Sequence, residues 1–163
     1  DLEVYLTSVT EQWAVATLSG PNAGKILQDA GIDFDLSPAE FPFMSMKEGH
    51  IGGLAARIFR ISFTGELSYE INVAARHGLA LWTRLMAAGK AYGITPYGTE
   101  AMHVLRAEKG FIIVGQETDG SVTPHDLGMD WIVSKTKPDF IGKRALARHA
   151  MEYDDRKQLV GLL

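Results

Sequence analysis

The sequence has no cysteine among its 163 residues. This absence excludes disulfide bonds, thiolate-bound metal sites and a cysteine nucleophile. The histidines also lack the H-x-x-x-H and H-E-x-x-H spacings that place two imidazoles on one helix face. They stand at positions 50, 77, 103, 125 and 149. The sequence therefore gives no indication of a metal site.

Basic clusters and long apolar runs are missing as well. Lys and Arg number 16 against 20 Asp and Glu, which gives a net charge of −4. Phosphate binding needs concentrated Lys and Arg, and a membrane helix needs about 20 consecutive apolar residues. No signal-peptide pattern opens the chain either. We therefore expect a cytoplasmic protein that has neither nucleic acid nor a membrane as a partner.

The chain also lacks an initiator methionine and a polar C-terminus. It begins directly in an alternating pattern, and residues 159–163 end it inside an apolar run. Natural termini are usually polar and frayed. We therefore expect this sequence to be a fragment of a longer chain, although its length and its hydrophobic content of 46% suit one domain with its own core.

Hydrophobic periodicity and turn residues predict the secondary structure. Strands are expected over residues 2–9, 13–18, 43–47, 54–62, 68–73 and 131–135, and helices over residues 21–31, 76–88, 96–110 and 142–151. The expected apolar stripe of the second helix consists of Leu79, Trp82, Leu85 and Met86. This order of elements favours an α+β fold, mostly antiparallel sheet with helices packed on one face.

Residues 58–71 are the most informative segment. Tyr69, Ile71 and Val73 alternate with polar residues, as in a half-buried strand. The Thr64-Gly65 pair before them is typical of a turn, so Glu66 is expected at a strand edge. A carboxylate held there can accept two parallel N–H bonds from a planar amidine-like group, such as the edge of a pterin or guanine. A surface glutamate after a hairpin turn fits the same spacing.

The same segment carries a family resemblance. Thr64-Gly65-Glu66 followed by Tyr69-Glu70-Ile71 resembles the T-G-E-x-G-Y-E-I signature of the aminomethyltransferase (glycine-cleavage T-protein) folate-binding family, with Ser68 in place of the usual glycine. Further motifs of that family follow in the same order. They are Leu18-Ser19-Gly20-Pro21-Asn22-Ala23, Leu81-Trp82, Leu105-Arg106-Ala107-Glu108-Lys109-Gly110, Thr123-Pro124 through Leu127-Gly128, and Asp139-Phe140-Ile141-Gly142-Lys143.

Two departures indicate the branch of the family. Met102-His103 replaces the Arg-Asp pair that glycine-cleavage T-proteins usually carry, which counts against a stand-alone aminomethyltransferase. Residues 108–129 instead resemble the α subunits of heterotetrameric sarcosine oxidases. A non-catalytic folate-binding module of the iron–sulfur maturation type would carry a cysteine that this chain lacks. A structural domain that keeps the fold without binding folate remains an alternative.

The resemblance implies a reaction and its cofactors. In sarcosine oxidases an N-methyl amine is oxidatively demethylated, and the one-carbon unit passes to tetrahydrofolate to give 5,10-methylenetetrahydrofolate. Residues 1–158 would be part of the folate-binding domain, and residues 159–163 would begin a following C-terminal barrel. FAD, FMN and NAD would be bound outside this sequence, which contains no G-x-G-x-x-G after a predicted strand. The other sarcosine oxidase subunits would be partners, and the fragment alone is expected to be inactive.

Three residues are candidates for folate binding. The resemblance assigns Glu66 as the anchor of the pterin ring. Phe59 corresponds by position to an aromatic residue that packs against the pterin in relatives, although an ordinary core role fits it equally. Arg106 could pair with a folate carboxylate or form an intramolecular salt bridge with Glu100 or Glu108.

No catalytic acid or base is assigned within this sequence. The resemblance implies that the carboxylate assisting proton transfer lies upstream of residue 1. Asp119 and Asp126 lie in a glycine-bearing polar segment and could take its place. Aspartates in such segments usually form turns through their own backbone, and we expect that role for both.

Overall fold

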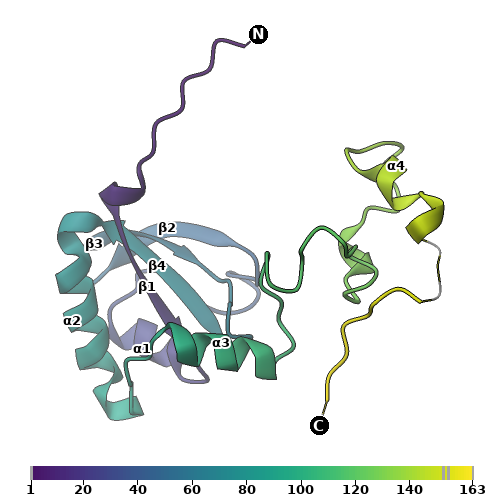
Figure 1. Cartoon of the computed structure of the whole chain (residues 1–163). Helices are drawn as coiled ribbons and strands as arrows, with labels where there is room; N and C mark the ends of the chain where they lie inside the picture. Colours follow the sequence, from purple (N-terminus) through teal and green to yellow (C-terminus); the bar gives the residue numbers. More distant parts are fainter. Residues whose placement is uncertain (1, 152, 154, 163) are drawn as a thin grey trace. The chain divides into compact units, whose positions relative to one another are not determined.

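The computed structural model describes residues 2–151, 153 and 155–162. By its internal contacts the chain divides into two compact units, Asp1–Phe111 and Ile112–Leu163. The first unit contains the whole sheet and the three longest helices, and the second consists mostly of loops and short helical turns (Figure 1). Neither unit has a helix in its described residues that is long and apolar enough to cross a membrane.

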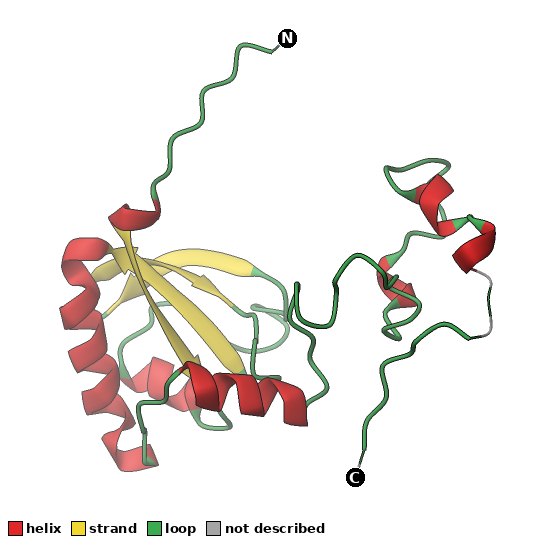
Figure 2. Cartoon of the chain, viewed as in Figure 1, coloured by secondary structure: helices red, strands yellow, loops and turns green. Residues whose placement is uncertain are grey.

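The first unit is built on one antiparallel sheet (Figure 2). Its strands are β1 (Trp13–Ser19), β2 (Met46–Ile51), β3 (Leu54–Phe59) and β4 (Ser68–Ala74), in the spatial order β1-β4-β3-β2. β4 lies in the middle and buries Tyr69, Ile71 and Val73, which are the alternate residues of its sequence pattern. The predicted strand over residues 68–73 and its antiparallel pairing with β3 are confirmed.

Two helices cover the buried face of the sheet. α1 (Ala23–Asp29) contributes Ile26 and Leu27 to the core, and α2 (Gly78–Gly89) contributes Leu81 and Leu85. Leu81 and Leu85 are four residues apart and so lie on one side of the helix. The predicted α+β class, with an antiparallel sheet and helices packed on one face, is confirmed by this arrangement.

α3 (Thr99–Glu108) follows within the first unit and has no fully buried residue. Its C-terminus is closed by Gly110, whose φ of +75° allows the N–H of Phe111 to bond the carbonyl of Arg106 at 2.8 Å. The helix predicted over residues 96–110 is therefore present but shorter. Pro96 to Gly98 stay outside it, and Gly98 is extended at the N-cap.

Several predicted elements are wrong or displaced. Residues 2–9 form no strand, because their alternating side chains find no sheet to pack on and stay largely exposed. The strand predicted over residues 43–47 begins at Met46 instead, after Met44 adopts a positive φ of 67°. Residues 131–135 contain part of the 3-10 turn Asp130–Ile132 in place of a strand. The last helix is reduced to α4 (Lys143–Leu146).

The second unit is organised around one buried ion pair. Asp126 is only 7% exposed and accepts bonds from Arg156 and from the N–H of Thr123, the latter at 2.6 Å. The Leu159 N–H also bonds the Asp126 carbonyl at 2.9 Å. Residues 156–159 are thereby tied to the loop around Asp126. The predicted domain boundary between residues 158 and 159 stays a prediction.

Candidate functional site

Glu66 lies in the connection between β3 and β4. β3 ends at Phe59 and β4 begins at Ser68, so residues 60–67 form a loop where the sequence predicted a tight turn between longer strands. Gly65 takes a φ of +78°, which only glycine adopts readily. The chain therefore bends at Thr64-Gly65, but the flanking segments are not paired up to it, so the predicted tight turn between strands is wrong.

This loop packs along one side of α3. The rings of Phe63 and His103 lie 6.3 Å apart between centroids. Lys109, at the C-cap of α3, has its ammonium Nζ 3.7 Å from Oε1 of Glu66. The Glu66 side chain is 47% exposed. The loop therefore presents a carboxylate that is oriented by the protein yet open to solvent on the other side.

Two hydroxyl groups of the same loop have no hydrogen-bond partner in the described part of the chain. They are Oγ of Ser62 and Oγ1 of Thr64, and both atoms are buried. Thr64 as a whole is only 2% exposed. Buried hydroxyl groups are normally bonded, because an unmade bond costs about 1–3 kcal/mol. The loop that carries Glu66 therefore has hydrogen-bonding capacity to spare.

Arg106 lies on the same helix as Lys109, three residues earlier. Its Nη1 donates to the carbonyl oxygen of Phe111 at 3.1 Å. The guanidinium therefore stabilises the C-terminal end of α3, where cations also interact favourably with the helix dipole. Arg106 and Glu66 thus belong to two elements in direct contact, the helix and the loop.

Phe59 is the last residue of β3. It lies opposite Met46 of β2 and Glu70 of β4 in the sheet register. Its neighbour Ile58 is fully buried in the core, and successive residues of a strand point to opposite faces. Phe59 therefore belongs to the face of the sheet that α1 and α2 do not cover, and it is half-buried there.

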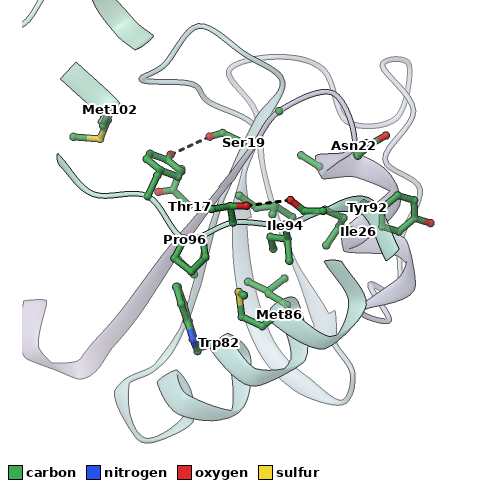
Figure 3. Close-up of a pocket in the computed structure, with 18 of the residues that line it drawn as sticks. Thr17, Ser19, Asn22, Ile26, Trp82, Met86, Tyr92, Ile94, Pro96 and Met102 are labelled. Atoms are coloured by element: carbon green, nitrogen blue, oxygen red, sulfur yellow. Dashed lines mark hydrogen bonds between the residues drawn. The ribbon is translucent and has the colours of Figure 1, made fainter. Parts of the chain in front are cut away.

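A hollow of the first unit lies elsewhere, between the sheet and the segment that leads into α3 (Figure 3). A pocket of about 530 Å³ is lined by β1, α1, α2, residues 92–98 and the start of α3. Trp82, Met86, Ile94 and Pro96 supply much of its apolar wall. Trp82 was expected within a buried stripe, but its side chain is 47% exposed and lines this pocket instead. None of Glu66, Phe59 and Arg106 is among the lining residues.

Hydrogen bonds join the rim of this pocket to the Glu66 loop. Oγ of Ser19 lies 2.8 Å from Oγ of Ser68 and 3.4 Å from the hydroxyl of Tyr97. The N–H of Gly20 bonds the carbonyl of Leu67 at 2.8 Å. The loop therefore ends at the pocket rim. Tyr97 was missed by sequence reasoning, because only the folded chain brings it to Ser19.

The two aspartates considered as catalytic alternatives have structural partners. Asp119 accepts bonds from the N–H and the hydroxyl of Ser121, which lowers its pKa. The Arg156 guanidinium beside Asp126 holds the pKa of that carboxyl far below its usual range, and the bonds from Thr123 act in the same direction. Both aspartates form turns, as expected. Such strongly ionised groups are poor proton donors and acceptors near neutral pH.

A family model described as the GCVT N-terminal domain matches residues 1–137. The match includes the sheet, α1 to α3 and the loop that carries Glu66.

Individual relatives come from three kinds of protein. Sarcosine oxidase subunit alpha from Corynebacterium sp. (strain U-96) is 52% identical over 100% of this chain and 17% of that protein. Aminomethyltransferase from Chlorobaculum parvum is 38% identical over 97% of the chain and 42% of that protein. Mitochondrial dimethylglycine dehydrogenase from Mus musculus is 36% identical over 88% of the chain and 17% of that protein. The chain thus spans 17% of the length of the sarcosine oxidase and dimethylglycine dehydrogenase relatives.

Proposed function

Because the chain belongs to the GCVT N-terminal domain family, we propose that it is the folate-binding domain of a sarcosine-oxidase-type enzyme. In this role it binds tetrahydrofolate while another part of the enzyme demethylates sarcosine oxidatively. The 52% identity to a sarcosine oxidase subunit alpha supports this choice within the family. FAD, FMN and NAD are then bound outside residues 1–163, and the other sarcosine oxidase subunits are partners.

The observation that carries the proposal is the presentation of Glu66. Its carboxylate projects from a loop that is fixed to α3 by Lys109 and by the Phe63–His103 contact. The side chain is about half exposed, so its oxygens are accessible. A carboxylate with two accessible oxygens can accept both N–H groups of the pterin amidine edge.

Phe59 and Arg106 are the other proposed contacts. Phe59 offers a ring on the uncovered face of the sheet, where a flat heterocycle can stack. Arg106 lies at the C-terminal end of α3, and its planar guanidinium has the geometry that pairs with a carboxylate such as that of folate. The resemblance in sequence supports both roles.

Tetrahydrofolate supplies the amine nitrogens that take up a one-carbon unit at the oxidation level of formaldehyde. The residues of this chain bind and orient it, and none of them is assigned proton transfer. Glu66 is assigned the anchoring of the pterin edge alone. The catalytic carboxylate is expected in a part of the protein outside this sequence.

A stand-alone aminomethyltransferase is the second candidate. The 38% identity to such an enzyme over 97% of the chain favours it. Met102 and His103 stand where these enzymes usually carry an Arg-Asp pair, which argues against it. Both candidates place tetrahydrofolate on Glu66, so they differ in the donor of the one-carbon unit.

Calorimetric titration with tetrahydrofolate tests the proposal. Glu66→Gln keeps the size of the side chain but replaces one acceptor oxygen by an N–H donor. We expect the dissociation constant to rise at least tenfold, or about 1.4 kcal/mol. Glu40→Gln, an exposed glutamate of the 37–41 loop, is the matched control and should bind as the wild type. Equal binding by the wild type and Glu66→Gln would remove Glu66 from the site.

A further inference from the structure

Lys109 occupies a rigid position at the end of α3. Its N–H bonds the carbonyl of Leu105 at 3.2 Å, and its own backbone is helical at the C-cap. The next residue, Gly110, turns the chain away with a φ of +75°. The Cα–Cβ bond of Lys109 is therefore fixed by the helix, so the direction in which its side chain leaves α3 is fixed as well.

The stem of Lys109 crosses the backbone of Gly65. A Cβ atom built on Gly65 would lie 2.1 Å from Cγ and 2.7 Å from Cβ of Lys109. These are the first carbons of the lysine, so they cannot swing aside without moving α3 or changing the rotamer. Gly65 thus serves two purposes, a positive φ and room for the lysine stem. The contact restricts the first torsion of the Lys109 side chain and so limits the region that the ammonium group can reach.

The ammonium group then reaches the next residue of the loop. Nζ of Lys109 lies 3.7 Å from Oε1 of Glu66. This distance gives attraction between the charges, but it is longer than a direct hydrogen bond of 2.7–3.2 Å. Glu66 is therefore held by its charge while its lone pairs stay available. An ionised carboxylate offers about four of them.

We infer that Lys109 is a positioning residue that orients the Glu66 carboxylate before the ligand binds. The inference rests on the proposed function in one respect, namely that the ligand is a folate. A glutamate side chain loses rotamer freedom when it is held. If the Glu66 side chain is already held before the ligand binds, part of this entropy loss no longer opposes binding. Lys109 raises affinity in this way without contacting the pterin.

A measurement without ligand tests the positioning directly. Lys109→Met keeps an unbranched stem over Gly65 and removes only the charge. We expect the ¹³C order parameter of the Glu66 side-chain Cγ to fall in Lys109→Met, because the charge that restricts the carboxylate is gone. Lys109→Arg should retain the wild-type value, and so should Lys25→Met on α1. An unchanged order parameter in Lys109→Met would overturn the inference, whatever binds to the loop.

Titration with tetrahydrofolate then separates this inference from the proposed function. We expect Lys109→Met to raise the dissociation constant about threefold, and to have no effect in a protein that already carries Glu66→Gln. Tighter binding by Lys109→Met would overturn the inference, because Lys109 would then compete with the ligand. A loss of affinity that persists in the Glu66→Gln background would also overturn it, because Lys109 would then contact the ligand itself. If the wild type binds no folate, the proposed function fails and the order parameter alone decides the role of Lys109.

Discussion

Two ion pairs of this protein differ in their exposure to solvent, and the difference separates their roles. Lys109 and Glu66 are 51% and 47% exposed at the side chain, whereas Arg156 and Asp126 are 18% and 7% exposed. Exposed pairs contribute at most about 1 kcal/mol to stability. Removing one partner of a buried pair costs about 3–5 kcal/mol. The first pair is therefore suited to ligand binding and the second to holding its unit together.

Asp126→Asn should loosen the second unit. The substitution removes the charge that faces Arg156 and leaves that guanidinium poorly paired in a partly buried position. We expect hydrogen exchange of the Thr123 and Leu159 amides, which bond Asp126 at 2.6 and 2.9 Å, to accelerate at least tenfold. That factor corresponds to about 1.4 kcal/mol. Asp139→Asn in the same unit is the control, and an unchanged exchange rate in Asp126→Asn would contradict the structural role.

The same aspartate predicts a dependence on pH. Arg156 lowers the pKa of Asp126 in the folded chain, while the unfolded value is about 3.9. The pair therefore contributes fully above about pH 4, and its contribution is lost as the pH falls through the lowered folded pKa. The difference in protection between wild type and Asp126→Asn should be constant from pH 5 to pH 7 and narrow below about pH 4. If the difference in protection increased below pH 4, the predicted stabilisation by ionised Asp126 would be wrong.

At the scale of elements, the contact between the β3–β4 loop and α3 gives a separate prediction. Gly65→Ala should destabilise the first unit for two reasons, its φ of +78° and its clash with Lys109. A left-handed conformation costs a non-glycine residue about 1–2 kcal/mol. Gly53 has a φ of +84° and open space where a Cβ would be, so Gly53→Ala measures the backbone cost alone.

Urea unfolding of both alanine variants separates the two costs. We expect Gly65→Ala to lower the free energy of unfolding by about 1 kcal/mol more than Gly53→Ala does, in line with the cost of overpacking. Equal losses would mean that the Lys109 stem moves aside freely. The proposed fixation of Lys109 by Gly65 would then be wrong.

The elements that could be predicted from the sequence are those whose pattern matches their burial. β4 alternates in sequence and buries Ile71 and Val73 on one face. Residues 2–9 alternate as well, yet form no strand, because alternation only shows that a segment suits a sheet and supplies no partner strand. The strand predicted over residues 131–135 failed for the same reason. In the second unit, Trp131 is 74% exposed.

The candidate site was predictable only in part. The T-G-E motif made Glu66 a candidate, and the structure places its side chain on an exposed loop; its role in binding stays a prediction. In the sequence, Lys109 was only one residue of the segment Leu105 to Gly110, and nothing indicated a role for it. Its approach to Gly65 depends on where α3 ends and how the helix meets the loop, which are tertiary properties. The pocket beside Trp82 and Tyr97 was not predicted at all, because it joins segments far apart in the sequence.

At the scale of the whole molecule, the family match covers residues 1–137, which are all of the first unit and part of the second. The chain spans 17% of the sarcosine oxidase relatives. We therefore propose that residues 1–163 bind and orient folate, and we assign them no redox step.

The most direct test of that assignment is a thermodynamic cycle of four binding measurements. It combines the wild type and Glu66→Gln with two ligands. Tetrahydrofolate is compared by calorimetry with an analogue in which the pterin 2-amino group is replaced by hydrogen. If Glu66 accepts from that group, removing the amino group weakens binding to the wild type at least tenfold and changes binding to Glu66→Gln little. If removal of the amino group weakens binding to both proteins equally, Glu66 and the pterin edge do not interact, and Glu66 is not the pterin anchor.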